Sequence, residues 1–207
     1  MIKVTNNISA NVIRTIALFS LRFTRSLRAN FNKISLVIIN FNRAKTQIPE
    51  NLILAVITIE DKRYFDHAGI DFYSILRALV KNTRAKRIEG ASTITQQLVR
   101  NTLNKREITI KRKINEILLS TLVSKEFSKE EIINAYLCTY NFNNCIGVYS
   151  LCSKENYNIN NLSNNEAAQI AARFKYPSIN KSNYINYLKR VRTIEVKFNH
   201  SNSLINL

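Results

Sequence analysis

Two adjacent carboxylates, Glu60 and Asp61, end an apolar segment and precede a run of cationic and aromatic residues that includes His67. Burial against apolar neighbours disfavours the charged form of a carboxyl group and suits it to general-base work, whereas nearby cations act in the opposite direction. A solvated helix end shows the same pattern. These residues alone therefore leave a catalytic and an ordinary structural interpretation open.

A second stretch, EGASTITQQLVRN at residues 89–101, is rich in hydroxyl and amide side chains and has almost no net charge. We expect such a stretch to be poor material for a hydrophobic core. With Arg100 at its end and Arg112 and Lys113 further along the chain, its hydroxyls and amides can form an anion-binding site. Arg112 and Glu116 are four residues apart, so a plain ion pair within one helix is the alternative interpretation.

Helices are expected to position these residues. Apolar residues recur at helical spacing after Pro49, from Asp71 onward, and from about Thr109 to Lys125. Pro49 suits a first helical turn, and Asp71 can cap the second helix. Because the chain has only three glycines and two prolines, long helices meet few interruptions, and an all-α fold is predicted.

Two further helix starts are predicted from capping boxes. Ser128 with Glu131 and Ser163 with Glu166 have the required spacing of three residues. The asparagine-rich stretch at residues 141–165 is the expected loop region.

Composition narrows the class of protein. The chain has 207 residues, of which 45% are hydrophobic and 22% charged, as in ordinary folded domains. Its formal net charge of +17 attracts polyanions such as nucleic acid, anionic lipid headgroups or pyrophosphate. No zinc-finger spacing or aromatic RNA-binding motif appears, so no nucleic acid is expected as a partner. Three cysteines, Cys138, Cys145 and Cys152, are expected to be buried thiols, not metal ligands or a disulfide framework.

The first 45 residues carry eight basic side chains and no acidic one. Their apolar runs are shorter than the roughly 20 residues that span a bilayer, and no clear signal peptide is recognised. Residues 1–46 can therefore lie on an anionic membrane as a basic amphipathic segment, or form a solvated basic arm. We expect the catalytic domain to comprise residues 47–207.

Four motifs in succession resemble those of the peptidoglycan glycosyltransferases of family 51. They are EDKRYFDHAG at 60–69, GASTITQQLVRN at 90–101, RKINE at 112–116 and KEEIINAYL at 129–137. The resemblance extends over about residues 47–195. It implies an all-α, lysozyme-like domain that polymerises lipid II into glycan strands, with inversion at the anomeric carbon and undecaprenyl pyrophosphate as the leaving group. Because no transpeptidase module follows residue 207, a monofunctional enzyme is expected.

The resemblance also assigns roles to residues of this chain. Glu60 matches the catalytic base, and Asp61 tunes the site or organises its cationic surroundings. Glu116 matches a second carboxylate of the family, which orients the pyrophosphate ligands Arg112 and Lys113 rather than transferring a proton. His67 belongs to the first motif, and Arg77 falls where the family has an arginine near the pyrophosphate. The expected lining of the donor site is Ser92, Thr93, Gln96, Gln97 and Arg100. Gly90 is expected where the backbone comes close to the substrate.

Several positions depart from the family pattern. Tyr64 replaces a phenylalanine and Arg100 a lysine. Ile108 stands where a basic residue is usual, leaving Arg106 or Lys111 to compensate, and Cys138 stands where an asparagine closes the fourth motif. These changes motivate an alternative, a weak or inactive homologue that binds lipid II or an anionic membrane.

Cofactor, partners and location follow from the same resemblance. No cofactor is expected to be required, with Mg²⁺ as optional assistance at the pyrophosphate. The expected partners are lipid II, the growing glycan chain, the anionic membrane surface and other proteins of cell-wall synthesis. The expected location is the outer face of the cytoplasmic membrane.

Overall fold

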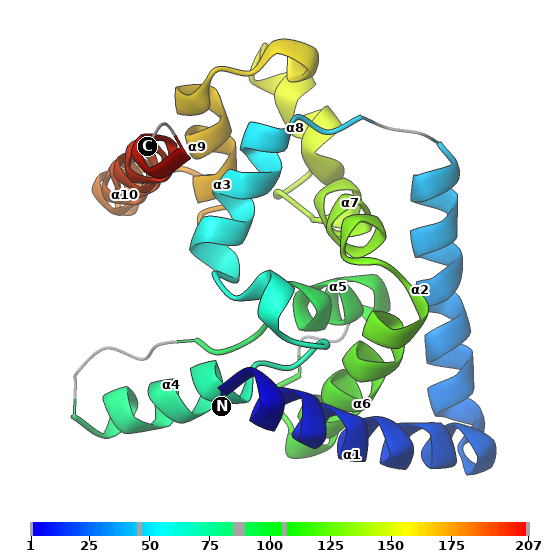
Figure 1. Ribbon diagram of the computed structural model, residues 1–207. Helices are drawn as coiled ribbons and strands as arrows, with labels where there is room; N and C mark the ends of the chain where they lie inside the picture. The colour runs from blue at the N-terminus through cyan, green and yellow to red at the C-terminus, as the bar shows by residue number, and fades with distance from the viewer. Residues whose placement is uncertain (1, 45–46, 85–89, 105–106, 206–207) are drawn as a thin grey trace. The chain divides into compact units, whose positions relative to one another are not determined.

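The computed structural model describes residues 2–44, 47–84, 90–104 and 107–205 (Figure 1). Helices dominate these residues, and their only β-type pairing is an antiparallel bridge between Asn141 and Ile146. The predicted all-α class is confirmed. The elements are α1 (Ile2–Phe23), α2 (Arg25–Arg43), α3 (Glu50–Glu60), η1 (Tyr64–Asp66), α4 (Phe72–Arg84), α5 (Ile94–Leu103), α6 (Ile110–Glu126), α7 (Lys129–Thr139), α8 (Gly147–Lys154), η2 (Ile159–Asn161), α9 (Asn164–Arg173) and α10 (Tyr184–Ile205).

The chain forms two compact units. The first comprises Met1–Ala44 and Arg63–Tyr136, and the second comprises Lys45–Lys62 and Leu137–Leu207. The division predicted from the sequence, with one boundary after residue 46, is a different one and stays a prediction.

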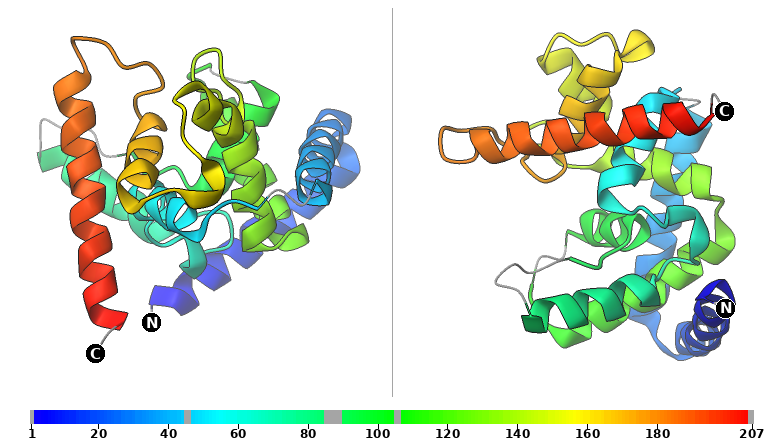
Figure 2. Two further views of the ribbon diagram at one scale, coloured as in Figure 1. Left: turned by 90° about the horizontal axis from the view of Figure 1, so that it is seen from above. Right: turned by 60° about the vertical axis from the view of Figure 1, so that its left-hand side comes forward.

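In the first unit, α5 packs against α2 and α6, and α1 packs against α2, α4 and α6 (Figure 2). Its core includes Ile34 and Ile38 of α2, Leu98 of α5, and Leu119 and Leu122 of α6, all at most 2% exposed. The basic N-terminal segment is therefore folded as helices, and α2 contributes to the core. No helix among the described residues is both long and apolar enough to cross a membrane.

In the second unit, α9 packs against α3, α8 and α10, and α10 also packs against α3. Leu52 and Val56 of α3 are fully buried, as are the small side chains of Ala167, Ala168 and Ala171 of α9. Because alanine side chains are short, they let neighbouring helices approach closely. The sequence contains no cap or motif that predicted the long helix α10.

The predicted helix caps are confirmed. Asp71 Oδ1 accepts hydrogen bonds from the Tyr73 and Ser74 amides at the start of α4. The Ser128 amide donates to Glu131, and the Glu131 amide donates to the Ser128 hydroxyl. Ser163 and Glu166 form the reciprocal pair at the start of α9.

The prediction of a loop over residues 141–165 is wrong in part, because this stretch contains α8 and η2. Gly147 begins α8 with φ of +77°, and a Cβ at this position would lie 2.3 Å from the Cys138 carbonyl oxygen. Asn143, Asn144 and Asn156 also have positive φ, a conformation that asparagine tolerates better than most residues. The asparagines therefore mark the turns that flank α8. The predicted burial of all three cysteines is confirmed.

Candidate functional site

A compact polar cluster joins α5 and α6 in the first unit. Lys113 Nζ donates hydrogen bonds to Ser92 Oγ at 3.2 Å, to Gln96 Oε1 at 2.7 Å and to Glu116 Oε1 at 2.7 Å. Arg112 Nη1 donates to the other oxygen of Glu116, whose side chain is only 3% exposed. We call Ser92, Gln96, Arg112, Lys113 and Glu116 the α5–α6 cluster. It brings together five of the predicted site residues.

Helix starts place the members of the α5–α6 cluster. The Thr109 hydroxyl accepts a hydrogen bond from the Arg112 amide and caps α6. Glu116 follows Arg112 by four residues and Lys113 by three, so both cations lie on the same side of α6 as the carboxylate. The ion pair within one helix that the sequence allowed is therefore present, but it is part of a larger network that reaches α5.

Thr93 has a structural position in the same unit. Its hydroxyl caps α5 by accepting a hydrogen bond from the Gln96 amide, and it donates to the Gly69 carbonyl at 2.7 Å. The residue is 2% exposed. Its hydroxyl is thus engaged by the protein, whereas the sequence assigned it to the lining of the donor site.

The expectation that the stretch from residue 89 is poor core material is wrong. Thr95 and Gln96 are fully buried, and Gln97 is 9% exposed and accepts a hydrogen bond from the Tyr136 hydroxyl at 2.8 Å. Buried polar groups need such partners. Gln96 Nε2 and Arg112 Nε have none among the described residues. An unpartnered buried donor costs free energy, which an acceptor bound beside it would offset.

Two predicted cations lie outside the network of the α5–α6 cluster. Arg100 is partly exposed on α5, one turn beyond Gln96 and on the same side of that helix. Arg77 is exposed on α4.

The first motif contributes buried residues to the first unit. His67 is 4% exposed, its ring lies edge-on to Tyr64, and its carbonyl accepts a hydrogen bond from Lys129 Nζ at 2.7 Å. Tyr64 is fully buried, and its hydroxyl donates to the Lys129 carbonyl. The hydroxyl that distinguishes Tyr64 from the usual phenylalanine therefore has an acceptor. Gly69 has φ of +86°, and a Cβ there would lie 2.3 Å from the Ser120 carbonyl oxygen.

Glu60 lies in the second unit, at the end of α3. Its carboxylate forms an ion pair with Arg190 of α10, and the two side chains are 13% and 18% exposed. Asp61, the C-cap residue of α3, is 8% exposed. Burial, Lys62 and Arg190 lower the pKa of Lys197 to about 8, so cationic groups surround this end of α3. Glu60 and Asp61 therefore belong to a different unit from the α5–α6 cluster.

Arg190 is the functional candidate that the sequence motifs missed. It is 130 residues from Glu60 and lies outside all four motifs, so only the folded chain reveals the pairing. A basic run in the last helix is the one signal present in the sequence, and it does not point to a particular arginine.

The positions that depart from the family pattern differ in environment. Ile108 is 99% exposed, Lys111 is exposed, and Arg106 lies outside the described residues. Cys138 is 5% exposed. At Gly90, a Cβ would meet no described atom within 4 Å, so packing alone does not require glycine there.

The described parts of the chain offer no ready metal site. No cluster of three or more histidine, cysteine, aspartate or glutamate side chains there is placed to hold a metal ion.

Transglycosylase domains have a lysozyme-like helical fold, and helices dominate the described residues of this chain. The family model described as Transglycosylase matches residues 39–198. The chain belongs to this family, as the four motifs predicted.

Several curated proteins are similar to this chain. Penicillin-binding protein 1A of Clostridium botulinum (strain Langeland) is 38% identical over 165 residues, which cover 72% of this chain and 20% of that protein. Penicillin-binding protein 1A of Clostridium tetani is 36% identical over 168 residues, covering 75% and 21%. Penicillin-binding protein 4 of Bacillus subtilis is 42% identical over 118 residues, covering 56% and 18%. The chain thus spans about a fifth of the length of these relatives.

Proposed function

We propose that this chain is a peptidoglycan glycosyltransferase that polymerises lipid II into glycan strands. The family and the similarity to penicillin-binding proteins support this function. The observation that carries it is the buried carboxylate of Glu116, which holds Arg112 and Lys113 beside the hydroxyl of Ser92 and the amide of Gln96. Two cations and one carboxylate leave a net charge of +1, which suits an anionic ligand.

In the proposed reaction, the 4-hydroxyl of the acceptor sugar attacks the anomeric carbon of the growing chain. The new C–O bond forms as the bond to the undecaprenyl pyrophosphate breaks, and the centre inverts. A base and a stabiliser of the leaving group are needed on opposite faces of the sugar, as in inverting glycosidases. From the motifs to which these residues belong, we assign the proton transfer to Glu60, and we assign the stabilisation of the charge that develops on the pyrophosphate to Arg112 and Lys113.

Glu116 acts through its neighbours in this mechanism. By accepting hydrogen bonds from both cations, it fixes their positions before substrate binds, so little reorganisation is needed as charge develops. No metal is required, because the cations of the protein supply the positive charge, and Mg²⁺ can assist by binding the pyrophosphate oxygens.

Arg190 positions the base. Its ion pair ties the Glu60 side chain to α10 and so limits the directions in which the carboxylate can point.

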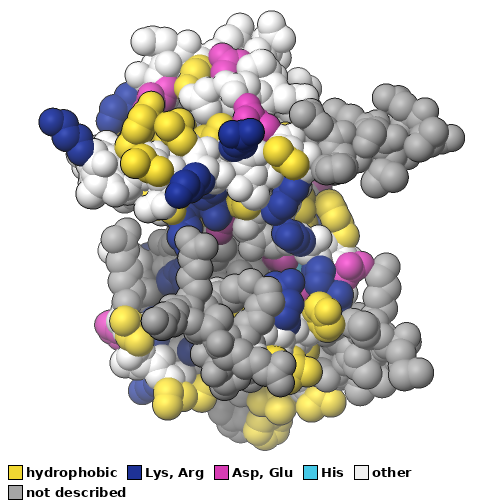
Figure 3. Space-filling model, turned by 90° about the vertical axis from the view of Figure 1, so that its left-hand side faces the viewer, with side chains coloured by type: hydrophobic (Ala, Val, Ile, Leu, Met, Phe, Trp, Pro, Cys, Tyr) yellow, Lys and Arg dark blue, Asp and Glu magenta, His cyan; other side chains and the backbone are white. Residues whose placement is uncertain are grey.

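We also propose that the basic N-terminal helices hold the protein on an anionic membrane, at the outer face of the cytoplasmic membrane. Val12, Ile16 and Phe19 of α1 are each more than half exposed, and their spacing of four and three residues places them on one side of the helix. Exposed Arg22 lies in the last turn of α1, and exposed Arg25 begins α2. Basic side chains are also widespread on the face shown in Figure 3. An apolar stripe with flanking arginines suits the interface of an anionic bilayer.

Polymerisation of lipid II by the purified chain tests the function, with glycan strands separated by size as the measurement. Lys113→Met removes the side chain that joins both helices of the α5–α6 cluster, and we expect it to lower the rate by about 100-fold or more. Lys125→Met, an exposed position on the same helix, is the matched control and should retain the rate. Equal rates in the two variants, or no product from the unmodified chain, would contradict the proposal.

A further inference from the structure

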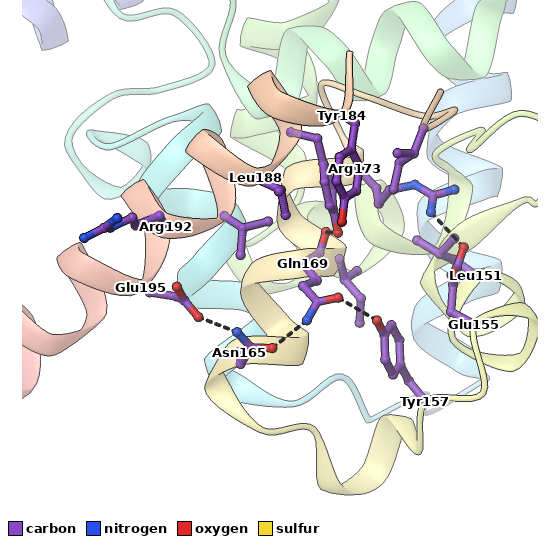
Figure 4. A pocket seen from close by; sticks show the side chains of 14 residues that line it. Leu151, Glu155, Tyr157, Asn165, Gln169, Arg173, Tyr184, Leu188, Arg192 and Glu195 are labelled. Atoms are coloured by element: carbon purple, nitrogen blue, oxygen red, sulfur yellow. Dashed lines mark hydrogen bonds and ion pairs between the residues drawn. The ribbon is translucent and has the colours of Figure 1, made fainter. Parts of the chain in front are cut away.

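The second unit contains a pocket of about 570 Å³ between α8, α9 and α10 (Figure 4). This volume lies within the range of small-molecule sites in proteins. Neither Glu60 nor Arg190 lines the pocket, although its wall includes other residues of α10. It is therefore a separate feature from the residues assigned to the reaction.

One side of the pocket presents a continuous row of hydrogen-bonding groups. The Tyr157 hydroxyl donates to Gln169 Oε1 at 2.8 Å, Gln169 Nε2 donates to Asn165 Oδ1, and Asn165 Nδ2 donates to Glu195. An amide nitrogen has two hydrogens, and a carboxylate or hydroxyl oxygen can accept more than one hydrogen bond. Each member of the row thus keeps capacity for a ligand. Alternating donors and acceptors of this kind suit a ligand with neighbouring hydroxyl or amide groups.

The charges that line the pocket balance. Arg173 Nη1 donates to Glu155 Oε1 at 2.7 Å, and one further acidic and one further basic residue, Glu195 and Arg192, complete the set. This balance contrasts with the charge of +17 on the whole chain. A strongly anionic or cationic ligand would have to compete with these internal pairs, so the pocket favours a neutral ligand.

The part of the pocket wall that residues 184–191 of α10 form is apolar and aromatic. Tyr187 and Val191 are each 6% exposed and lie deep, whereas Tyr184 and Leu188 are about half exposed and lie at the rim. A ligand for this pocket needs one apolar face and one edge of hydroxyl groups. A pyranose ring has both, because its C–H bonds point to its faces and its equatorial hydroxyls point outward.

We propose that this pocket binds a neutral sugar, namely an N-acetylhexosamine unit of a glycan strand. The sugar's C–H face packs on Tyr184 and Leu188, and its hydroxyl and acetamido groups bond to Gln169 and Asn165. The choice of N-acetylhexosamine rests on the proposed function, since that reaction makes a polymer of such sugars. The pocket would hold a segment of strand through residues other than those assigned to the reaction.

The test is a titration of the full chain with chitotriose, a neutral N-acetylglucosamine trimer, followed by saturation-transfer NMR and calorimetry. Tyr184→Ala should weaken binding by about threefold to tenfold, because an aromatic contact is lost. Tyr184→Phe keeps the ring and should bind as the unmodified chain does. Tyr176→Ala alters a partly exposed tyrosine of the same unit outside the pocket, and it should have no effect.

A second variant guards against a folding defect. Tyr157→Phe removes one hydroxyl from the polar row, and it should also weaken binding while circular dichroism stays unchanged. Absence of binding at millimolar chitotriose, or equal binding by Tyr184→Ala, Tyr157→Phe and the unmodified chain, would overturn the proposal. Binding without any polymerisation of lipid II would refute the proposed function alone, and polymerisation without binding would refute the pocket alone.

Discussion

At the scale of single residues, the second unit contains an ion pair between two side chains that are far apart in the sequence. Glu60 and Arg190 form an ion pair in which both side chains are largely buried. A carboxylate on a flexible side chain acts efficiently as a base only when its direction is fixed within a small angle. In the proposed mechanism, the arginine therefore contributes through the geometry of Glu60 as a positioning residue.

Substitution of Arg190 tests this role. Arg190→Met should lower kcat by about 10-fold to 100-fold with a smaller effect on KM, because the base loses its orientation. Arg190→Lys keeps a cation in reach and should restore part of kcat. Steady-state polymerisation kinetics separate the two parameters. If both variants lose only thermal stability and keep kcat, Arg190 has a purely structural role.

At the scale of elements, the residue that caps α4 also forms an ion pair. Asp71 is 1% exposed, accepts hydrogen bonds from the start of α4, and forms an ion pair with Arg63 at 3.1 Å. Burial acts to raise the pKa of Asp71, but hydrogen bonds from Ser74 and the charges of Arg63 and His67 outweigh it and lower the pKa. The ionised carboxylate thus stabilises the fold.

Replacement of Asp71 by alanine should reduce the free energy of unfolding by about 2 to 4 kcal/mol, since a cap and a buried ion pair are lost together. The pKa is lower in the folded than in the unfolded chain, so this stabilisation is fully present above the unfolded value near 3.8. It is lost as the pH falls through the lower, folded value. Urea unfolding of the unmodified chain and of Asp71→Asn between pH 2 and pH 7 measures this contribution. A difference that stays constant with pH would argue against it.

The elements also show which features a sequence reveals. The capping residues of α4, α7 and α9 were predicted correctly, because a cap depends on side chains within three residues of the helix start. The burial of Thr95, Gln96 and Gln97 was not foreseen, because their partners, such as Tyr136, are distant in the sequence. Arg190 escaped for the same reason. The members of the α5–α6 cluster were anticipated from the motifs, but the hydrogen bonds from Lys113 to Ser92 and Gln96 appear only in the folded chain.

At the scale of the whole molecule, positive charge is the dominant property. The chain carries 31 basic and 14 acidic residues, and its N-terminal segment contains no acid. Such a charge attracts anionic lipid and a pyrophosphate alike. Net charge alone therefore does not distinguish these two ligands. In the N-terminal segment, the basic residues lie close in the chain to the exposed apolar residues Val12, Ile16 and Phe19 of α1.

Co-sedimentation with vesicles that contain phosphatidylglycerol tests membrane attachment. Arg22→Gln with Arg25→Gln removes two charges near the stripe and should weaken binding by about tenfold or more, because each basic residue contributes about 1 kcal/mol near an anionic surface. Lys154→Gln with Lys181→Gln makes the same change of charge at exposed positions of the second unit. Equal losses in both double variants would show that net charge, and not α1, governs binding.

The most direct measurement is the rate of lipid II polymerisation by the unmodified chain and by Glu60→Gln. The amide keeps the size of the side chain but cannot take a proton from the acceptor hydroxyl. We expect glycan strands from the unmodified chain and a loss of at least about 100-fold in Glu60→Gln, with the helical circular dichroism unchanged. Equal polymerisation by the two proteins would contradict the assignment of Glu60 as the base.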